Sequence, residues 1–421
     1  MSSMDLRQAF VGLLTLSMFM MLGNMIKKDH FDYSINDVEI QATQVSQRES
    51  VTVTQPSMAT VSHLSKKPLK QNDKGLKSCW NPPSALKEVE QSEGFILFSL
   101  TNGPEYHILQ IADAVVVARH LGATLVLPDI KNSKSGYSIN LGDVYDVGNI
   151  LNKLKGLVKV TKTLPPKVST RNTPIVRVPN KVSQDYIVNK ITPNYKTKRI
   201  IKIESHFPSR NNNNFDLLAC QAMFGTLEWK SEIQEVAESI VQNLQTRSQE
   251  SNGQFVAVDL KNECNGKYES GRKQCYNGHE IGEFLNKIGF GQETVVYVTQ
   301  TKWSTDLNSL RYMFPKTYTK ENIMLATEKE KFLSSESIEV EKVIDFYVCS
   351  ERDIFVPSIP GGLFYESVAG MRIVSGKSQI IVPSEIVSSS ASVSEYMSRY
   401  VTKKNHFAYK CYCNCISVCL I

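Results

Sequence analysis

The 421-residue sequence lacks the short motifs that mark the commonest metal and dinucleotide sites. It contains no Cys-x-x-Cys pair and no His-Glu-x-x-His, which disfavours the usual zinc sites. No Gly-x-Gly-x-x-Gly occurs, which disfavours an ordinary dinucleotide enzyme. There is no Asn-x-Ser/Thr sequon, an absence that leaves a lumenal location open. The excess of positive charge is small, 48 Lys and Arg against 42 Asp and Glu, and does not indicate a nucleic-acid partner.

The composition is that of a folded protein of more than one domain. Hydrophobic residues make up 41% and charged residues 21% of the chain, both near the globular average. At roughly 100–200 residues per domain, two or three domains are expected.

One long apolar run stands near the amino terminus. Residues 9–26 contain no charged side chain and end at Lys27 and Lys28. As a helix the run would span about 27 Å, close to the thickness of a thin bilayer. A cleaved signal peptide is the alternative, but it would have a shorter apolar core and a small-x-small cleavage site. We therefore expect a cytosolic tail (1–8), a transmembrane signal anchor (9–26) and a polar lumenal stem (27–78). The flanking charges do not fix the orientation.

A strand–turn–helix–strand pattern opens the globular part. Residues 95–100 predict a buried strand, 101–106 a turn containing Asn-Gly-Pro, and 107–121 a helix with a 3.6-residue apolar period. Gly122 follows where a helix ends, and 124–128 predict the next strand. Such a unit belongs to a parallel sheet and places a phosphate-sized ligand near its first turn.

A second alternating system follows an amphipathic helix expected over 230–246. Its expected strands are 255–263, 293–300, 354–358 and 378–383, and its expected helices are 277–288, 305–314, 343–349 and 362–371. We predict an α/β, GT-B-like fold in which two Rossmann-like domains, 79–240 and 241–413, face a cleft, followed by a divergent tail, 414–421.

The stretch 159–203 carries eleven Lys and Arg residues against one acid, Asp185. Two interpretations stay open: a solvated loop surface, or a surface along which a polyanion or sugar diphosphate approaches. Stacking aromatic side chains do not alternate with the basic ones, so nucleic acid fits poorly.

Several segments carry a resemblance to a known family. GFILFSL…QIADAVVVARHLGATLVLPDI, FVAVDLKNE and VIDFYVCSERDIFVPS…GLFYESVAGMR resemble the plant O-fucosyltransferase-like glycosyltransferases, over about residues 78–413. NGPEYH, CYNGHEIGEFL, FPKTYTKENIM and KKNHFAYKCYC are similar to the mannan-synthesis-related subgroup. The resemblance implies a type II Golgi membrane protein with a lumenal GT-B domain. It also implies inverting, metal-independent transfer from a nucleotide sugar, with a GDP-linked donor favoured over a UDP-linked one. The absence of Asp-x-Asp fits a metal-independent reaction.

The chain departs from the family at two places. The family's Gly-Gly-Leu-Asn-Gln loop is replaced by residues 101–106, and its His-Leu-Arg triplet by Asp259-Leu260-Lys261. The resemblance makes Lys261 the cation for the leaving phosphate, although an ammonium lacks the bidentate fork of a guanidinium. For Asp259 two roles stay open: a catalytic base, or a structural partner that holds Lys261.

The remaining predicted positions lie at the first turn and around the last predicted strand–helix connection. The predicted substrate-binding residues are Asn102, Gly103, His107, Asp353, Phe355, Ser358, Gly361 and Gly362. The resemblance places Asp353, Phe355 and Ser358 where the family contacts the nucleotide. Gly361 and Gly362 precede an expected helix and suit backbone N–H contact to phosphate. Phe355 is equally a core candidate, and His107 a helix-capping one.

Nine cysteines suit a lumenal protein with disulfides. Cys264 and Cys275 form a natural short loop and are the disulfide candidate.

Three hypotheses about function follow. The first is a Golgi glycosyltransferase-like protein of mannan or glucomannan synthesis, with a nucleotide sugar and a glycan acceptor as substrates. The second is a non-catalytic partner of a membrane mannan synthase. The third is an active O-fucosyltransferase. No metal cofactor is expected.

Overall fold

The fold is taken from a computed structural model. It describes residues 76–78, 94–131, 137–207, 216–249, 253–261, 264, 268–269, 272–273, 275–333, 338–351, 353–383 and 393–413. The predicted anchor (9–26) and the tail 414–421 lie outside these residues, as does the predicted stem up to residue 75. Within the described part of the chain, no helix is both long and apolar enough to cross a bilayer.

Residues Leu64–Ile421 form one compact unit. Its first sheet is parallel throughout, with strand order β7-β4-β2-β9-β8. The strands are β2 (Phe95–Leu97), β4 (Thr124–Val126), β7 (Val160–Thr161), β8 (Ile175–Pro179) and β9 (Ile200–His206). Helix α2 (Pro104–His120) connects the first two strands and is buried over most of its length. The predicted strand–helix–strand unit is therefore confirmed.

The predicted strand 95–100 is divided between two sheets. After β2, the chain enters β3 (Leu100–Thr101), which pairs with β5 (Ile130–Lys131) and, through it, β6 (Ser138–Ile139). Helix α2 begins at Pro104, earlier than the apolar period indicates, because proline fits the first position of a helix. The other helices of this half are α3 (Leu141–Val144), α4 (Val147–Lys155), α5 (Gln184–Tyr186), α6 (Thr192–Lys198) and α7 (Leu217–Gly225), with a π-helical turn, Ile187–Ile191, before α6.

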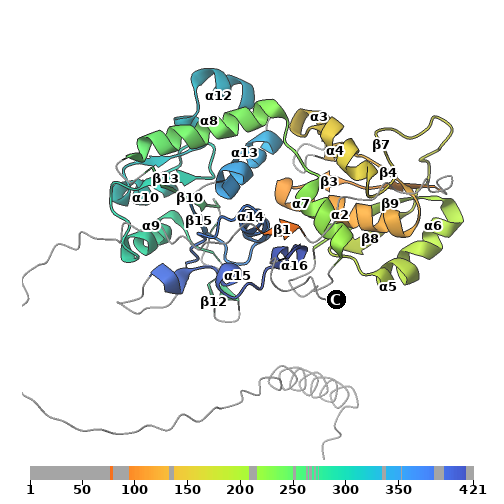
Figure 1. The fold of residues 1–421 in the computed structure, drawn as a ribbon. Helices are drawn as coiled ribbons and strands as arrows, with labels where there is room; N and C mark the ends of the chain where they lie inside the picture. Colours follow the sequence, from red (N-terminus) through yellow and green to blue (C-terminus); the bar gives the residue numbers. More distant parts are fainter. Residues whose placement is uncertain are drawn as a thin grey trace, which may run out of the picture. The chain divides into compact units, whose positions relative to one another are not determined.

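Helix α8 (Ser231–Arg247) confirms the predicted amphipathic helix. Its buried side chains are those of the predicted apolar face: Ile233, Val236, Ala237, Ile240, Val241 and Leu244. The helix packs against α13 (Ile338–Glu351) and β13 (Val295–Val298) of the second half (Figure 1). The boundary expected between residues 240 and 241 falls inside this continuous helix, so α8 as a whole belongs with the second half.

The second sheet is also parallel throughout, with strand order β14-β13-β10-β15. Besides β13, its strands are β10 (Phe255–Asp259), β14 (Thr317–Tyr318) and β15 (Ile354–Pro357). Its helices, besides α13, include α9 (Gly278–Lys287), α10 (Asn308–Met313), α11 (Lys320–Ile323), α12 (Ala326–Phe332) and α14 (Leu363–Val374). The last predicted strand, 378–383, is wrong as a regular strand: Ile380 and Ile381 form only isolated bridges.

The last described strand pairs with the first one. β1 (Lys77–Ser78) pairs antiparallel with β16 (Tyr412–Cys413), which follows α15 (Arg399–Thr402) and α16 (Ala408–Cys411). The predicted stem, 27–78, therefore ends inside the fold. One cluster of buried apolar side chains includes residues of both sheets, α2 and α8, which explains why the two parallel systems form a single compact unit.

Candidate functional site

The turn before α2 presents the amino end of this helix. Asn102 (φ 72°) and Gly103 (φ 115°) both have left-handed backbone, and Pro104 starts the helix. The side chain of Gln110, two turns into α2, holds the turn, since it accepts from the Thr101 N–H (3.0 Å) and donates to the Thr101 hydroxyl (2.9 Å). The φ of 115° favours glycine at position 103, and a Cβ there would also lie 2.8 Å from Glu105 Oε2.

A cavity of about 460 Å³ lies at this helix end, and both parallel systems line it. The lining residues are Asn102, Glu105, Tyr106, Asp259, Lys261, Thr299, Lys342, Asp345 and Phe364. Asp259 ends β10 and Thr299 directly follows β13, so the carboxyl ends of two parallel strands meet the cavity, the usual place for a ligand in such sheets. We call this space the donor cavity.

Lys261 and Asp259 form an ion pair at the donor cavity. Their Nζ and Oδ1 atoms are 2.9 Å apart, with the Lys261 side chain 45% exposed and Asp259 buried. The Thr299 hydroxyl donates to the same Asp259 oxygen (3.2 Å), and the ammonium lies 4.8 Å from the centre of the Phe364 ring. Burial lowers the pKa of Lys261, but the negative charges of Asp259, Glu105 and Asp345 outweigh it and leave this pKa raised. Lys261 is therefore a fixed cation.

Two more lysine–carboxylate pairs stand around the donor cavity. Lys342 Nζ lies 2.7 Å from an oxygen of Glu339, whose side chain is buried. Lys320, also buried, lies 2.5 Å from Asp345, which in addition accepts from the Tyr297 hydroxyl (2.7 Å). Burial raises the pKa of Asp345 to about 6 despite the neighbouring ammonium of Lys320.

Glu105 is the carboxyl at the donor cavity without a salt-bridge partner among the described residues. Its Oε2 atom is buried and makes no hydrogen bond there. Burial raises the pKa of Glu105 from 4.5 to about 7, and the ammonium groups of Lys261 and Lys342 only partly oppose this shift. A carboxyl with a pKa near neutrality can exchange protons with a substrate at physiological pH. Glu105 was not predicted from the sequence, where an acid in a first helical turn indicates only a favourable charge–dipole contact.

The structure brings five of the predicted residues to one region. Asp259, Lys261 and Asn102 line the donor cavity, and Gly103 lies behind Glu105. Ser358 directly follows β15, and its N–H donates to the Asp259 carbonyl (3.0 Å), which places it at the same sheet edge. The Ser358 hydroxyl is buried and has no hydrogen-bond partner among the described residues.

Gly361 and Gly362 precede α14, whose first turn contributes Phe364 to the donor cavity. Gly361 has a φ of 86°, a conformation that favours glycine, and no side chain caps the helix. The contact of the first-turn N–H groups of α14 with a phosphate stays a prediction from the sequence.

The predicted substrate contact of His107 does not fit its position. The ring is fully buried and its Nδ1 lies 2.7 Å from the Tyr145 hydroxyl. Burial, with the nearby Lys342 charge, lowers the pKa of His107 to about 3, so the imidazole is neutral. It is a packed core residue behind the amino end of α2.

Asp353 and Phe355 also lie away from the donor cavity. Asp353 stands before β15, where its carboxylate accepts from the Phe255 N–H (3.3 Å) at the start of β10. The length of β10, roughly 13 Å, separates that end of the sheet from Asp259. Phe355 is 0% exposed, so its ring is core and cannot stack on a base. The core alternative for Phe355 is the one the structure shows.

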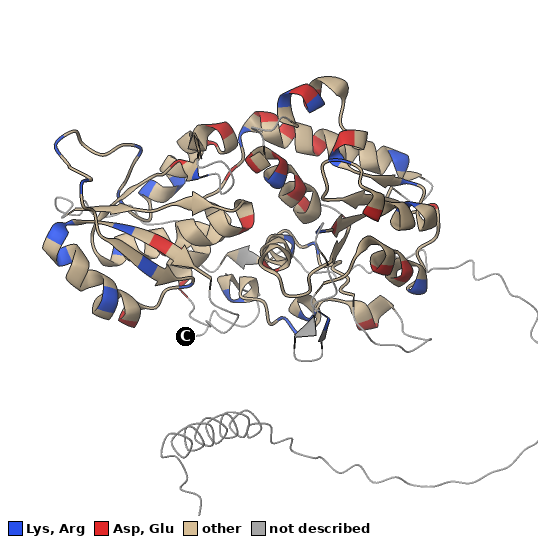
Figure 2. Cartoon of the chain, turned by 180° about the vertical axis from the view of Figure 1, so that it is seen from behind, with Lys and Arg blue, Asp and Glu red and all other residues tan. Residues whose placement is uncertain are grey.

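The basic stretch 159–203 does not contribute to the donor cavity. Its lysines and arginines are spread over several strands, helices and loops of the first half, from before β7 to β9 (Figure 2). None of them is among the residues that line the donor cavity. The position of these residues therefore does not support the interpretation of 159–203 as an approach surface for a sugar diphosphate.

The predicted disulfide between Cys264 and Cys275 is confirmed. A second one joins Cys220 of α7 to Cys411 of α16, a pairing that the sequence could not specify. Among the described residues, no group of three or more His, Cys, Asp or Glu side chains is arranged to hold a metal ion.

Comparison with known proteins assigns the chain to a family. The family model described as GDP-fucose protein O-fucosyltransferase matches residues 108–375. The chain is 75% identical to Protein MANNAN SYNTHESIS-RELATED of Trigonella foenum-graecum, covering 98% of this chain and 100% of that relative. It is 45% identical to Protein MANNAN SYNTHESIS-RELATED 1 of Arabidopsis thaliana, covering 97% and 99%.

Among solved structures, NodZ α-1,6-fucosyltransferase soaked with GDP-fucose matches with a TM-score of 0.43 and 14% identity, covering 69% of this chain and 95% of that one. The family match spans more than half of the chain, and the two plant relatives match nearly all of it. The chain therefore belongs to the O-fucosyltransferase-like glycosyltransferase family, together with the mannan synthesis-related proteins.

Proposed function

We propose that this protein is a glycosyltransferase that acts in mannan or glucomannan synthesis and transfers a sugar from a nucleotide sugar to a glycan, with inversion. The observation that carries the proposal is the donor cavity. There a fixed cation, Lys261, and an unpaired carboxyl, Glu105, face one space between two parallel α/β systems.

The chemistry assigns these two groups different tasks. The Glu105 carboxylate accepts the proton of the acceptor hydroxyl as its oxygen forms a bond to C1 of the sugar. The bond from C1 to the β-phosphate oxygen breaks, and its electron pair leaves with the nucleotide diphosphate. Lys261 and the first-turn N–H groups of α14 offset the charge that grows on that phosphate.

The relatives support the process and the donor. Two of them carry mannan synthesis in their names, and the family model names GDP-fucose. A GDP-linked sugar is therefore the proposed donor, and the proposed reaction uses no metal, because Lys261 and backbone N–H groups serve the phosphate.

A non-catalytic partner of a mannan synthase is the second candidate, and one observation favours it. Each lysine at the donor cavity already has a carboxylate partner, and no arginine is among the lining residues. A nucleotide diphosphate must therefore compete with Asp259 for Lys261.

A transfer assay combined with complementation separates the two candidates. The full chain is incubated with GDP-mannose or GDP-fucose and manno-oligosaccharides, as wild type and as the double variant Asp259→Ala/Lys261→Ala. We expect wild-type transfer, and a loss of well over about a hundredfold in the double variant. If the folded double variant fully restores mannan content in plants lacking the native protein, the glycosyltransferase hypothesis is rejected and the non-catalytic partner role is supported.

We also propose a Golgi membrane location with residues 27–421 in the lumen, supported by the uncharged run 9–26. A reporter fused after Ile421 should resist protease in sealed vesicles and become sensitive when detergent is added. Digestion without detergent would overturn the orientation.

A further inference from the structure

A second cavity, of about 340 Å³, adjoins the donor cavity at the amino end of α9. Its lining residues are Leu260, Lys261, Cys264, Asn277, Gly278, His279, Gln300, Asp306 and Ser309. Lys261 lines both spaces, so a ligand in the second cavity lies next to the proposed site of transfer.

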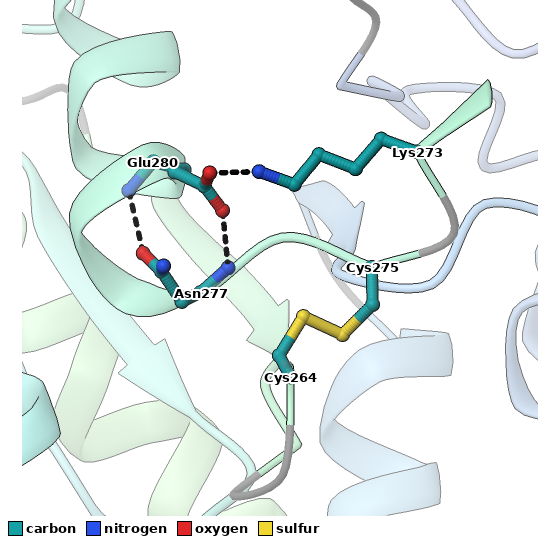
Figure 3. The surroundings of a disulfide bond; sticks show 5 residues. All are labelled: Cys264, Lys273, Cys275, Asn277 and Glu280. Carbon is teal, nitrogen blue, oxygen red and sulfur yellow. Dashed lines mark hydrogen bonds and ion pairs between the residues drawn. A yellow bond between two sulfur atoms is a disulfide. The ribbon is translucent and has the colours of Figure 1, made fainter. Parts of the chain in front are cut away.

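A disulfide and several hydrogen bonds hold the backbone beside this cavity (Figure 3). The Cys264–Cys275 disulfide holds the segment that leads into α9. Asn277 caps the helix: its side chain accepts from the Glu280 N–H (3.0 Å), and its own N–H donates to the Glu280 carboxylate (2.9 Å). Lys273 pairs with the same carboxylate. Such a preorganised wall lowers the entropic cost of binding a ligand.

The lining chemistry is mixed and close to neutral. The amide nitrogens of Asn277 and Gln300 are donors, and the Asp306 carboxylate and the Ser309 hydroxyl offer acceptors. The positive charge of Lys261 is offset by the negative charge of its partner Asp259, and the Asp306 carboxylate adds a second negative charge. A diphosphate would be repelled by Asp306, whereas sugar hydroxyls, which both donate and accept, satisfy such a set.

Helix α10 contributes Ser309 to the cavity, carries Tyr312 and contacts Trp303. Tyr312 is 86% exposed and follows the lining residue Ser309 by three positions, so both lie on one face of the helix. Trp303 packs on the same helix, where its indole N–H donates to the Asn308 side chain (3.0 Å) and the Arg311 guanidinium lies 4.8 Å from its ring centre. An exposed tyrosine supplies an apolar face and a polar tip, which suits the apolar face and the hydroxyl edge of a pyranose ring.

We propose that this second cavity, together with Tyr312 of α10, binds the neutral oligosaccharide that accepts the transferred sugar. The inference rests on the proposed function, because the acceptor is the substrate of that same site. Sugars of the oligosaccharide lie against Tyr312 and in the polar cavity, and the hydroxyl that accepts the new sugar reaches Lys261 and the donor cavity.

Binding of mannohexaose to the full chain tests the proposal. Affinity is measured by isothermal titration calorimetry for the wild type, Tyr312→Ala, Asp306→Asn and Tyr137→Ala, and GDP affinity is measured on the same samples. Tyr137, 77% exposed in the other half of the protein, is the matched control. We expect Tyr312→Ala and Asp306→Asn each to weaken mannohexaose binding about three- to tenfold. Tyr137→Ala should bind like the wild type, and GDP affinity should stay constant in all four.

The outcomes separate this inference from the proposed function. Equal mannohexaose affinity in the wild type, Tyr312→Ala and Asp306→Asn overturns the acceptor site, as does a wild type that binds GDP but no mannohexaose. In both cases the proposed transfer from a GDP-linked donor survives. Mannohexaose binding that depends on Tyr312, without any GDP binding, keeps the glycan site and rejects the donor.

Discussion

Replacing Glu105 by glutamine should remove most sugar transfer while leaving nucleotide binding intact. Glutamine keeps the shape of the side chain beside Gly103 but cannot accept a proton from the acceptor hydroxyl. It also removes a negative charge near Lys261, so the affinity for GDP should stay equal or rise slightly.

The magnitude and the pH dependence follow from the pKa of Glu105. With a pKa of about 7, roughly a tenth of the side chain is carboxylate at pH 6 and roughly nine-tenths at pH 8. The carboxylate is the active form, so wild-type kcat/KM should rise about tenfold between these values. A general base contributes about a hundredfold or more, so Glu105→Gln should lose at least that factor at pH 8 and show a flat profile.

Asp113 offers a matched control on the same helix. Its buried carboxyl also has a pKa raised by burial to about 7, but it bonds to Ser205 (3.0 Å) and does not line the donor cavity. The assay is transfer of labelled sugar from the GDP-linked donor to manno-oligosaccharides between pH 5.5 and 8.5, for the wild type, Glu105→Gln and Asp113→Asn. Asp113→Asn should keep the wild-type profile.

The fold of Glu105→Gln can be checked independently. Because the folded state raises the pKa of Glu105, it binds a proton more tightly than the unfolded state, and stability falls as the pH rises from about 4.5 to about 7. Glutamine removes this loss, so the urea midpoint at pH 8 should not decrease. The assignment of Glu105 as the base would be refuted by wild-type activity in a folded Glu105→Gln variant. It would also be refuted if the pH dependence of kcat/KM were lost in Asp113→Asn rather than in Glu105→Gln.

Three further predictions concern the ion pairs and a disulfide. Lys261→Ala should weaken GDP binding about ten- to a hundredfold in calorimetry, with Lys261→Arg retaining affinity, because a charged phosphate contact is lost; unchanged affinity would move the diphosphate elsewhere. Lys320→Met should lower the free energy of unfolding by about 3–5 kcal/mol in urea titrations, because the buried carboxylate of Asp345 loses its partner. The double variant Lys320→Met/Asp345→Asn should recover part of the lost stability, and an unchanged stability of Lys320→Met would contradict the role of the buried pair. Cys411→Ser should cost about 2–5 kcal/mol, since the link to Cys220 closes a separation of 191 residues, and an unchanged melting temperature would show that the bond adds no stability.

Local patterns determined the fold class of this protein. Apolar runs bounded by turn residues predicted β2, β4, β10, β13 and β15, and the 3.6-residue period predicted α8 down to its buried side chains. The strands β7, β8 and β9, which lie in or next to the basic stretch 159–203, were not predicted, and neither was β14. Such signals are readable because a strand or helix must place its own apolar side chains on the face that becomes buried. The ends of elements were predicted less well. Helix α2 starts earlier than its apolar period indicates, because Pro104 fits the first helical position. Residues 378–383 form only isolated bridges, because the extent of strand pairing depends on partners elsewhere in the chain.

The candidate site was only partly available from the sequence. Asp259, Lys261 and the glycines before α14 follow strands or precede helices, so their place at the carboxyl edge of a sheet could be predicted. Asp353, Phe355 and Ser358 lie within six residues of one another in the sequence, but only Ser358 is at the carboxyl edge of the sheet. Asp353 lies at the opposite end of the sheet, and Phe355 lies in the core. The direction of a strand separates them, since each residue advances the chain by roughly 3.3 Å.

By itself, the sequence determined the opening unit of the first α/β system, the strand–helix alternation of the second, and the α8 helix. It also determined the family membership and the Cys264–Cys275 disulfide, because each of these depends on residues close together in the chain or on motifs read in order. Only the tertiary structure placed Glu105 opposite Lys261, buried His107, and joined Cys220 to Cys411. A raised carboxyl pKa arises when distant elements exclude water from a side chain, and no local pattern records which distant elements those are.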